Sequence, residues 1–422
     1  MPADSAPVRS LYVHVPFCAH KCEYCAFYSA PAGGDQINRY VQALVRELEL
    51  IAPDCQPNTA FFGGGTPSML NLQQWQTILS TMQRLGLDRA AEWTVECNPA
   101  TVSADKARLL RDAGVNRISM GVQSFDESLL ERLGRIHTRD QVYRSYDILR
   151  AAGFENVNID LMFAIPGQSL DLWRSTIDEA LRLGTEHLSC YEVIYEDDTP
   201  LYEQLKAGQF DVDEDLACDM YDLLVDRLAD AGFRQYEIAN FARSARPGTT
   251  PPLPPLDSGI PDYACRHNVT YWRGQDSYGL GPSASEYVRG LRSRNWANTT
   301  LYCEQLEKGR RAKEFAEALA PAARAGELAA FGLRMNAGWP FAEFTERTGF
   351  DLREEWRFEL TQLVTRGWAE ETPTHFRLTR QGLRFADAAA ELLLRPESAP
   401  NSTTPSRIAL VGRPSPAVVL TH

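Results

Sequence analysis

Short runs of apolar residues alternate with longer segments of mixed polarity through the first half of the chain. The short runs predict strands at residues 11–15, 60–62, 93–97, 117–122, 157–163 and 187–194. In the longer segments apolar residues recur every three or four positions, which predicts amphipathic helices such as those at residues 36–50, 103–112 and 141–152. This regular order predicts a parallel sheet with right-handed crossovers, curled into a partial or full barrel.

Glycines stand between several of these helices and the strands that follow them. They occupy positions 86, 114, 153 and 184, where a helix commonly ends on a residue with left-handed backbone. Glycine adopts that backbone without a steric cost. The four glycines therefore support the predicted helix ends.

The pattern changes after Gly232. Residues 246–255 are rich in proline and predict an exposed, extended loop. From residue 301 the spacing becomes helical, with apolar positions at Phe315, Leu319, Leu328, Phe331 and Leu333. Helical residues 360–364, strand-like residues around 376–378 and a helix from residue 380 then predict a small winged-helix-like unit.

These patterns divide the chain into parts. We expect a short tail at residues 1–9, a core at residues 10–298 and a mostly helical, winged-helix-like domain at residues 299–395. The core includes an insertion at residues 244–263, which contains the proline-rich loop. Residues 396–422 are rich in Pro, Ser and Thr and predict a disordered tail.

The composition is that of a large globular protein. With 44% of its 422 residues hydrophobic, the chain can bury a sizeable core. The net charge is −13, and Lys and Arg are scattered, which argues against a nucleic-acid partner. No apolar run is long enough to span a membrane, and residues 1–4 lack the features of a secretory signal. We therefore expect a cytoplasmic protein with reduced cysteines, and peripheral contact with a membrane stays open.

Three cysteines follow the first predicted strand. Cys18, Cys22 and Cys25 are separated by three and then two residues. Three thiolates need a fourth ligand to close a tetrahedral zinc site, but they can hold three irons of a cubane cluster and leave the fourth iron open. Half of a zinc finger or a redox pair would show similar spacing. The loop lies at the carboxyl end of a strand, where α/β barrels carry their chemistry.

A glycine triplet provides a second chemical signal. Residues 63–65 follow a short apolar strand and precede Thr66. Without side chains, the backbone can approach a ligand closely and present its amides and carbonyls to it. Glycine runs are also common in simple turns, so this signal gains weight only beside the cysteine loop.

Several motifs in one order resemble a known family. Beyond the cysteine loop and the glycine triplet, they lie at residues 12–17, 96–99, 117–125, 133–137, 160–162, 166–168 and 267–272. Together they resemble the radical S-adenosylmethionine (SAM) superfamily, its anaerobic coproporphyrinogen III oxidase-like branch and, within that branch, the HemW family of heme chaperones. The resemblance covers about residues 11–296 and continues more faintly to about residue 394.

The resemblance implies a fold and a set of ligands. The fold is a radical SAM partial (β/α)6 TIM-like barrel with a C-terminal, mostly helical winged-helix-like domain. Cys18, Cys22 and Cys25 would bind three irons of a 4Fe-4S cluster, and SAM would chelate the fourth. The residues implied to bind SAM are Tyr12, Gly64, Gly65, Thr66, Glu96, Gln123, Arg135 and Asp160. For each of these, an ordinary ion pair or buried polar role is the alternative.

One position in the cysteine loop distinguishes two kinds of relatives. The oxidases carry a further cysteine two residues after the third, where this chain has Phe27, as the heme chaperones do. The chain also begins close to its first strand, without the long N-terminal segment of the oxidases. The resemblance therefore implies a heme chaperone that transfers heme to an acceptor protein, such as a respiratory enzyme. The alternative is an oxygen-independent coproporphyrinogen III oxidase, which decarboxylates a porphyrinogen with a radical derived from SAM.

The candidate heme ligand is His267. A neutral imidazole is a good axial ligand of heme iron, and Tyr271 and Trp272 offer flat apolar surfaces for a porphyrin. From the residues alone, a histidine hydrogen-bonded within a loop, with both aromatics in the core, is the simpler interpretation. The resemblance to heme chaperones favours the heme ligand. The cluster and SAM would then permit dimerisation or transfer of heme, so a homodimer is among the expectations.

Overall fold

A single large sheet organises the chain in the computed structural model, which describes residues 6–31, 33–245 and 259–395. Its central strands lie parallel and adjacent in chain order. They are β1 (Val8–Val15), β4 (Cys55–Gly64), β5 (Glu92–Cys97), β6 (Arg117–Gln123), β7 (Val157–Phe163) and β8 (His187–Glu192). All six predicted strands are therefore confirmed, although the last of them ends at Glu192 and not at residue 194.

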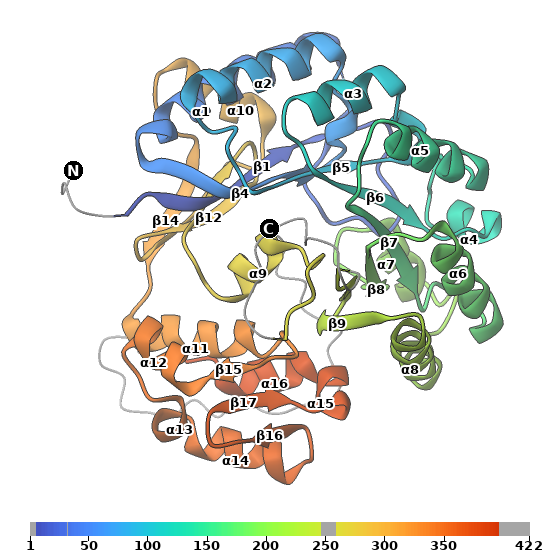
Figure 1. Ribbon diagram of the computed structural model, residues 1–422, viewed down its shortest axis with the longest axis vertical. Helices are drawn as coiled ribbons and strands as arrows, with labels where there is room; N and C mark the ends of the chain where they lie inside the picture. The colour runs from blue at the N-terminus through green and yellow to red at the C-terminus, as the bar shows by residue number, and fades with distance from the viewer. Residues whose placement is uncertain (1–5, 32, 246–258, 396–422) are drawn as a thin grey trace.

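Helices cover the outer face of the curved sheet (Figure 1). They are α1 (Gly34–Ile51), α2 (Leu72–Leu85), α3 (Ala104–Asp112), α4 (Glu127–Arg132), α5 (Arg139–Ala151) and α6 (Leu170–Leu183). Gly86 and Gly184 end their helices with a φ of 72°, and Gly114 and Gly153 have φ values of 105° and 88°. The left-handed helix ends expected from the sequence are thus confirmed. This arrangement is the partial (β/α)6 barrel.

The sheet continues beyond the barrel at both edges. Next to β8 lie the antiparallel strands β10 (Asn240–Arg243) and β9 (Phe233–Glu237), preceded by α7 (Pro200–Lys206) and α8 (Glu214–Asp230). Next to β1 lie β11 (Ser277–Leu280), β12 (Ser285–Val288), β13 (Leu291–Asn295) and β14 (Lys313–Ala318). Between the last two strands, α10 (Thr299–Glu307) packs against α1.

Two expectations from the sequence are corrected at these edges. The helical spacing read around Phe315 is wrong, because this residue lies in strand β14 and is 40% exposed. Strand β14 pairs with β13 in the large sheet and α10 packs against α1, although we had assigned both elements to the C-terminal domain. At the other end of the chain, residues 8 and 9, which we expected in a tail, are the first residues of β1.

The C-terminal domain has its own core and a small sheet. Its helices are α11 (Pro321–Gly332), α12 (Phe341–Thr348), α13 (Leu352–Glu355), α14 (Arg357–Thr365), α15 (Arg380–Arg384) and α16 (Ala386–Leu393). Its sheet consists of β15 (Trp339–Pro340), β17 (His375–Leu378) and β16 (Ala369–Glu371). Trp339, Phe344, Trp356 and Phe376 are buried in its core. This is the mostly helical, winged-helix-like domain expected from the sequence.

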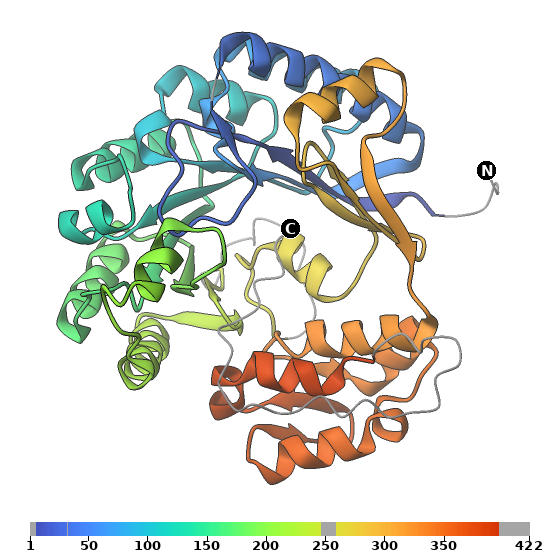
Figure 2. The ribbon, with the colours of Figure 1, turned by 180° about the vertical axis from the view of Figure 1, so that it is seen from behind.

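A short helix stands between the barrel and this domain. Helix α9 (Arg266–Trp272) lies within the curve of the sheet, and the C-terminal domain lies beyond it (Figures 1 and 2). Most of the proline-rich insertion, residues 246–258, and the expected disordered tail at residues 396–422 fall outside the described residues. Among the residues that are described, no helix is both long and apolar enough to cross a membrane.

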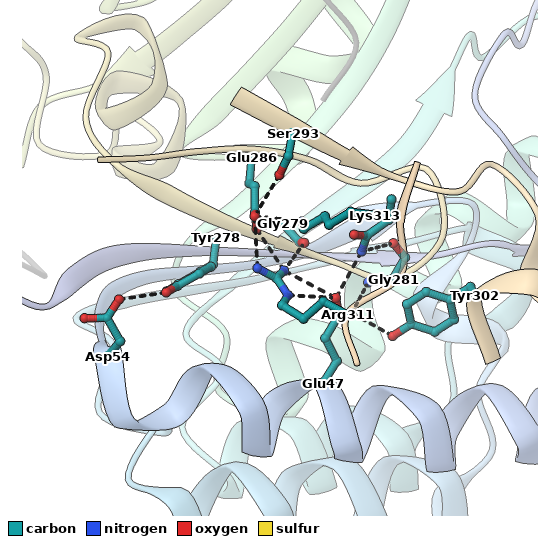
Figure 3. Close-up of polar contacts among 11 residues, drawn as sticks. Glu47, Asp54, Tyr278, Gly279, Gly281, Glu286, Ser293, Tyr302, Arg311 and Lys313 are labelled. Atoms are coloured by element: carbon teal, nitrogen blue, oxygen red, sulfur yellow. Dashed lines mark hydrogen bonds and ion pairs between the residues drawn. The ribbon is translucent and has the colours of Figure 1, made fainter. Parts of the chain in front are cut away.

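A buried polar network ties the added strands to the barrel (Figure 3). Glu47 of α1 is fully buried and accepts hydrogen bonds from the Gly281 amide at 2.9 Å and the Tyr302 hydroxyl at 2.8 Å. Arg311 lies 3.3 Å from the same carboxylate and 2.8 Å from Glu286 of β12. The ammonium of Lys313 is 2.7 Å from Glu286. Two buried carboxylates are thereby matched by two cations from the segment that leads into β14.

Candidate functional site

One cavity, with a volume of about 390 Å³, runs through the interior of the barrel. Every residue that we predicted to bind iron, SAM or heme lines it. These residues are Tyr12, Cys18, Cys22, Cys25, Gly64, Gly65, Thr66, Glu96, Gln123, Arg135, Asp160 and His267. The periodicity of strands explains the convergence, because alternate side chains of each strand point to the same face of the sheet. In β6, for example, Arg117, Ser119, Gly121 and Gln123 all line the cavity.

The cysteine loop lies at the carboxyl end of β1. Its three thiols are free and half-buried, and the Cys25 amide donates to the Cys22 carbonyl at 3.2 Å, which turns the loop back on itself. The Arg135 guanidinium donates to Cys22 Sγ at 3.4 Å, and the Thr66 hydroxyl lies 3.5 Å from Cys18 Sγ. Three free thiols with a neighbouring cation suit an iron-sulfur cluster, whose thiolates carry negative charge.

Burial also affects the protonation of the cysteine thiols. Burial raises the pKa of Cys18, and it raises the pKa of Cys25 to about 11. A metal binds the thiolate, so loading iron at neutral pH must release protons from this loop. Within the described residues, no three His, Cys, Asp or Glu side chains surround a position for a single metal ion. The donor set fits a cluster that is built across three separated thiols.

The glycine triplet is held directly beneath the cysteine loop. The Gly65 amide donates to the Val15 carbonyl at 2.9 Å, and the Thr66 amide donates to the Phe17 carbonyl at 2.8 Å. A Cβ atom at Gly65 would lie 2.7 Å from the Val15 oxygen and 2.9 Å from the Phe17 nitrogen, too close for any side chain. The Gly64 amide donates to Glu96 at 3.1 Å. These three amides bind protein groups, while Gly64, Gly65 and Thr66 all line the cavity.

Two buried carboxyl groups line the middle of the cavity. Glu96 stands near the end of β5, and Asp160 stands in β7, where it accepts a hydrogen bond from the Asn158 side chain at 2.6 Å. Burial, reinforced by the negative charge of Asp160, raises the pKa of Glu96 to about 8. Burial also raises the pKa of Asp160. Such a pair favours a ligand that brings positive charge or hydroxyl donors.

Gln123 and Arg135 complete this polar region. Gln123 ends β6 with a φ of 69°, an uncommon backbone for a residue other than glycine, and its side chain lines the cavity. Arg135 donates to the Gly121 carbonyl at 2.5 Å as well as to Cys22. A Cβ atom at Gly121 would lie 3.2 Å from the Gln123 amide nitrogen and 3.4 Å from Arg135. Gly121 therefore leaves the space that both side chains occupy.

The raised pKa of Glu96 predicts a pH dependence of stability. Between its ordinary pKa of 4.5 and about 8, the folded state holds a proton that the unfolded state has lost. The contribution of Glu96 to the free energy of unfolding is thus fully present below pH 4.5. It falls as the pH rises to about 8, by at most about 1.4 kcal/mol per pH unit. Glu96→Gln should abolish this part of the dependence of the free energy of unfolding on pH. The measurement is urea denaturation of the ligand-free protein at a series of pH values from 5 to 8. If the free energy of unfolding depended on pH equally in the wild-type protein and in the variant, the raised pKa of Glu96 would be contradicted.

His267 lies on a helix and not in a loop. Glu92, which is buried in β5, accepts the amides of Arg266 and His267 at 2.9 and 3.0 Å and so caps α9. The imidazole stacks on Phe61 with ring centroids 5.1 Å apart. Its Nδ1 lies 3.2 Å from the Ser10 hydroxyl. This contact and the stacking on Phe61 hold the imidazole in place.

The cavity connects two separate ends. Ser10, which contacts His267, stands five residues before Val15 at the end of β1, a distance of about 16 Å along the strand. The cysteine loop therefore lies at the carboxyl end of the barrel, and His267 lies toward the amino end. Trp272 also lines the cavity, whereas Tyr271 packs against Phe331 with centroids 5.8 Å apart. Of the two aromatics expected to support a porphyrin, the structure brings only Trp272 to the cavity.

Other lining residues were missed by the sequence analysis. Ile136 and Tyr191 are 55% and 40% exposed and line the cavity with apolar surface, next to Phe27, which the sequence had marked only by its place in the cysteine loop. Arg117 and Arg334 line it as well, the latter from the C-terminal domain. Arg117 could have been found by counting back in steps of two from Gln123 along the predicted strand. No local pattern marks Arg334, because only the docking of two domains brings it to the barrel.

Two family models match the chain. The radical SAM superfamily model matches residues 12–180, and the HemN C-terminal domain model matches residues 319–385. The solved structure of coproporphyrinogen III oxidase (HemN) from Escherichia coli superposes with a TM-score of 0.78 at 21% identity, covering 92% of this chain and 90% of that one. The fold and the cysteine loop thus define a protein of the radical SAM superfamily, a family that carries a 4Fe-4S cluster and SAM.

Relatives that are similar over most of the chain show which family within the superfamily it belongs to. "Heme chaperone HemW" from Lactococcus lactis is 33% identical over 388 residues, which is 92% of this chain and 97% of that protein. The chain belongs to the HemW family. HemW from Escherichia coli is 33% identical over 394 residues, 92% of this chain and 98% of that protein. "Radical S-adenosyl methionine domain-containing protein 1, mitochondrial" from Danio rerio is 33% identical over 280 residues, 65% of this chain and 59% of that protein.

Proposed function

We propose that this protein is a heme chaperone, which binds heme and passes it to an acceptor protein. The names of its relatives support this function, since proteins that share about a third of its residues over nearly the whole chain are called heme chaperones. The structural observation that carries the proposal is the continuity of the cavity. The cysteine loop and His267 line the same space, so the two ends of one ligand chamber carry the two kinds of iron ligand.

The chain's own residues divide the work between the two ends. At the carboxyl end, Cys18, Cys22 and Cys25 would hold three irons, and bound SAM would complete the fourth and supply one-electron chemistry when the cluster is reduced. Glu96 and Asp160 would accept the ribose hydroxyls or the ammonium of SAM, and their raised pKa values mean that a cationic ligand binds with loss of protons.

The remaining predicted residues take positioning roles. Arg135, which contacts Cys22 of the cysteine loop, would contact SAM, as would Gln123. Tyr12 lies beside His267 with ring centroids 6.3 Å apart, lines the cavity and would contact SAM. Gly64, Gly65 and Thr66 line the cavity and would contact the methionine end of SAM. Phe27, in place of a further cysteine, would offer an apolar edge to a flat ligand.

Heme transfer also implies partners and a place of action. The acceptor would be a protein that needs heme, such as a respiratory enzyme, and a homodimer would permit exchange between two chains. We propose that the protein acts in the cytoplasm and contacts a membrane peripherally while it delivers heme. The absence of a basic surface run in the sequence continues to argue against nucleic acid.

The test of heme binding uses His267. The anaerobically reconstituted protein should bind about one heme per chain, with a Soret band typical of histidine ligation. His267→Gln should shift the Soret band and weaken heme binding by about tenfold or more, because the axial ligand is lost, while the iron-sulfur absorbance stays unchanged. His375→Gln, the same change on β17 of the C-terminal domain, should alter neither. A Soret spectrum unaffected by His267→Gln would remove this residue as the ligand.

A second assay separates the chaperone from its catalytic relatives. The same reconstituted protein, supplied with SAM and a reductant, should leave coproporphyrinogen III unconverted. Efficient decarboxylation would replace the proposed function with that of an oxidase. Transfer is measured by mixing the heme-loaded protein with an apo-hemoprotein and following the Soret band of the acceptor.

A further inference from the structure

The inner end of the cavity, defined by Arg117, His267, Trp272 and Arg334, carries hydrogen-bond donors without acceptors. The Nε atoms of Arg117 and Arg334 and the Nε1 atom of Trp272 are buried and have no partner within the described residues. All three side chains line the cavity. Nearly all buried polar groups in proteins are hydrogen-bonded. Three side chains that line one end of a cavity and carry unpaired donors therefore point to an acceptor bound at this end.

Arg117 is the central member of this group. It is the first residue of β6, and only 2% of its surface is exposed. In the described part of the chain, its guanidinium forms neither a hydrogen bond nor an ion pair of 4.0 Å or less. Burying an unpaired charge is costly. A protein that needed Arg117 only for packing would lose little by having an apolar side chain at this position.

The carboxylates near Arg117 are committed to other groups. Glu92 caps α9 through two amides, and Asp160 accepts the Asn158 side chain. Glu237 accepts the Ala239 amide at 2.9 Å and the side chain of Asn240. Burial lowers the pKa of the Arg117 guanidinium, but neighbouring acidic groups, Cys265 and Glu92 first among them, hold it above the ordinary value. They leave its donors facing the cavity, where a ligand can reach them.

Trp272 and Arg334 join this end of the cavity through Tyr236. Trp272 packs with Tyr236 in one apolar cluster, and Arg117 is among the charged groups that lie near the Tyr236 hydroxyl. The Arg334 guanidinium stacks over the Trp272 ring at 4.7 Å and contacts Asp387 at 3.4 Å. The C-terminal domain thus contributes a cation to the barrel interior. The inner end combines two guanidinium groups with an indole donor beside His267.

We propose that this end binds a carboxylate of the ligand that enters the barrel, with Arg117 as the main anchor and Trp272 and Arg334 as supporting donors. The inference rests on the proposed function, in which the ligand is heme and the carboxylate is one of its propionates. A buried guanidinium binds a carboxylate through charge-assisted hydrogen bonds that are stronger than neutral ones. SAM also carries a carboxylate, so the shared chemistry is a carboxylate, and the test separates the two sources.

The experiment compares heme with heme dimethyl ester, which keeps the iron and the ring but lacks both carboxylates. Wild-type protein should bind heme about 10- to 100-fold more tightly than the ester, as one charge-assisted contact would predict. Arg117→Gln should lose this preference by weakening heme alone, with the affinity for the ester unchanged. Arg117→Lys, which keeps the charge but not the planar fork, should retain part of the preference. SAM affinity, measured by calorimetry, should be unaffected.

A control variant tests whether the loss of a positive charge alone has an effect, and several results would contradict the inference. Arg84→Gln removes one positive charge from an exposed ion pair with Glu49 and should leave all three affinities unchanged. A wild-type protein that does not distinguish heme from its ester, or an Arg117→Gln variant that weakens both equally, overturns the inference and leaves heme binding intact. A loss confined to SAM assigns the carboxylate to that cofactor instead. Failure of the wild-type protein to bind either porphyrin overturns the proposed function and the propionate assignment together.

Discussion

Replacing Cys22 with serine is expected to lower the iron of the anaerobically reconstituted protein from about four atoms per chain to less than one. A hydroxyl is a poor ligand for cluster iron, which prefers soft thiolate sulfur. Cys22 is also the thiol that Arg135 contacts, at 3.4 Å. SAM binding should fall with the cluster, because the open iron is lost. Iron and sulfide analysis and the charge-transfer absorbance measure the first effect.

A matched change tests whether this loss is local. Cys218 is a half-buried free cysteine on α8 and does not line the cavity. Cys218→Ser should therefore keep the full iron content and the SAM affinity of the wild-type protein. Retention of four irons by Cys22→Ser would mean that the three cysteines do not form the cluster site. Equal loss in both variants would indicate a general effect of thiol removal on folding.

The barrel could be predicted from the sequence because its strands are buried on both faces. Such strands are continuous apolar runs, and the glycines at positions 86, 114, 153 and 184 mark where helices end before the next strand begins. The cysteine loop and the glycine triplet were found for a related reason, since their chemistry depends on neighbours in the sequence. Residues such as Glu96 and Asp160 came from the resemblance, and strand alternation explains why they share one cavity.

The features that were missed depend on contacts between distant segments. Strand β14 is exposed along almost its whole length, so its sequence lacks the alternation of buried and exposed residues that marks a half-buried strand. Only its pairing with β13 defines it as a strand. Helix α9 is too short for a periodic pattern, and it forms because Glu92, from a distant strand, caps it. Arg334 enters the cavity through the docking of the C-terminal domain. In each case the deciding partner lies far away in the sequence.

The network around Glu47 shows how much such distant contacts can contribute. Arg311→Met should lower the free energy of unfolding by about 3–5 kcal/mol, because it leaves the charge of Glu47 buried without a cation. Glu47 would keep the donors of Gly281, Asn295 and Tyr302, while Glu286 would keep its ion pair with Lys313. Urea denaturation followed by circular dichroism measures the change. Since α1 and β12 both lose a contact, the added strands should become less protected against hydrogen exchange than the central barrel.

Two further variants separate the buried charge from the loss of packing. The double variant Glu47→Gln with Arg311→Met should recover about half or more of the lost stability, because a neutral amide is much cheaper to bury than an unpaired carboxylate. Arg294→Met breaks an exposed pair with Glu314 on the neighbouring strands and should cost no more than about 1 kcal/mol. If Arg311→Met were as mild as Arg294→Met, water would be reaching Glu47. The added strands would then be held to the barrel by apolar contacts and the sheet alone.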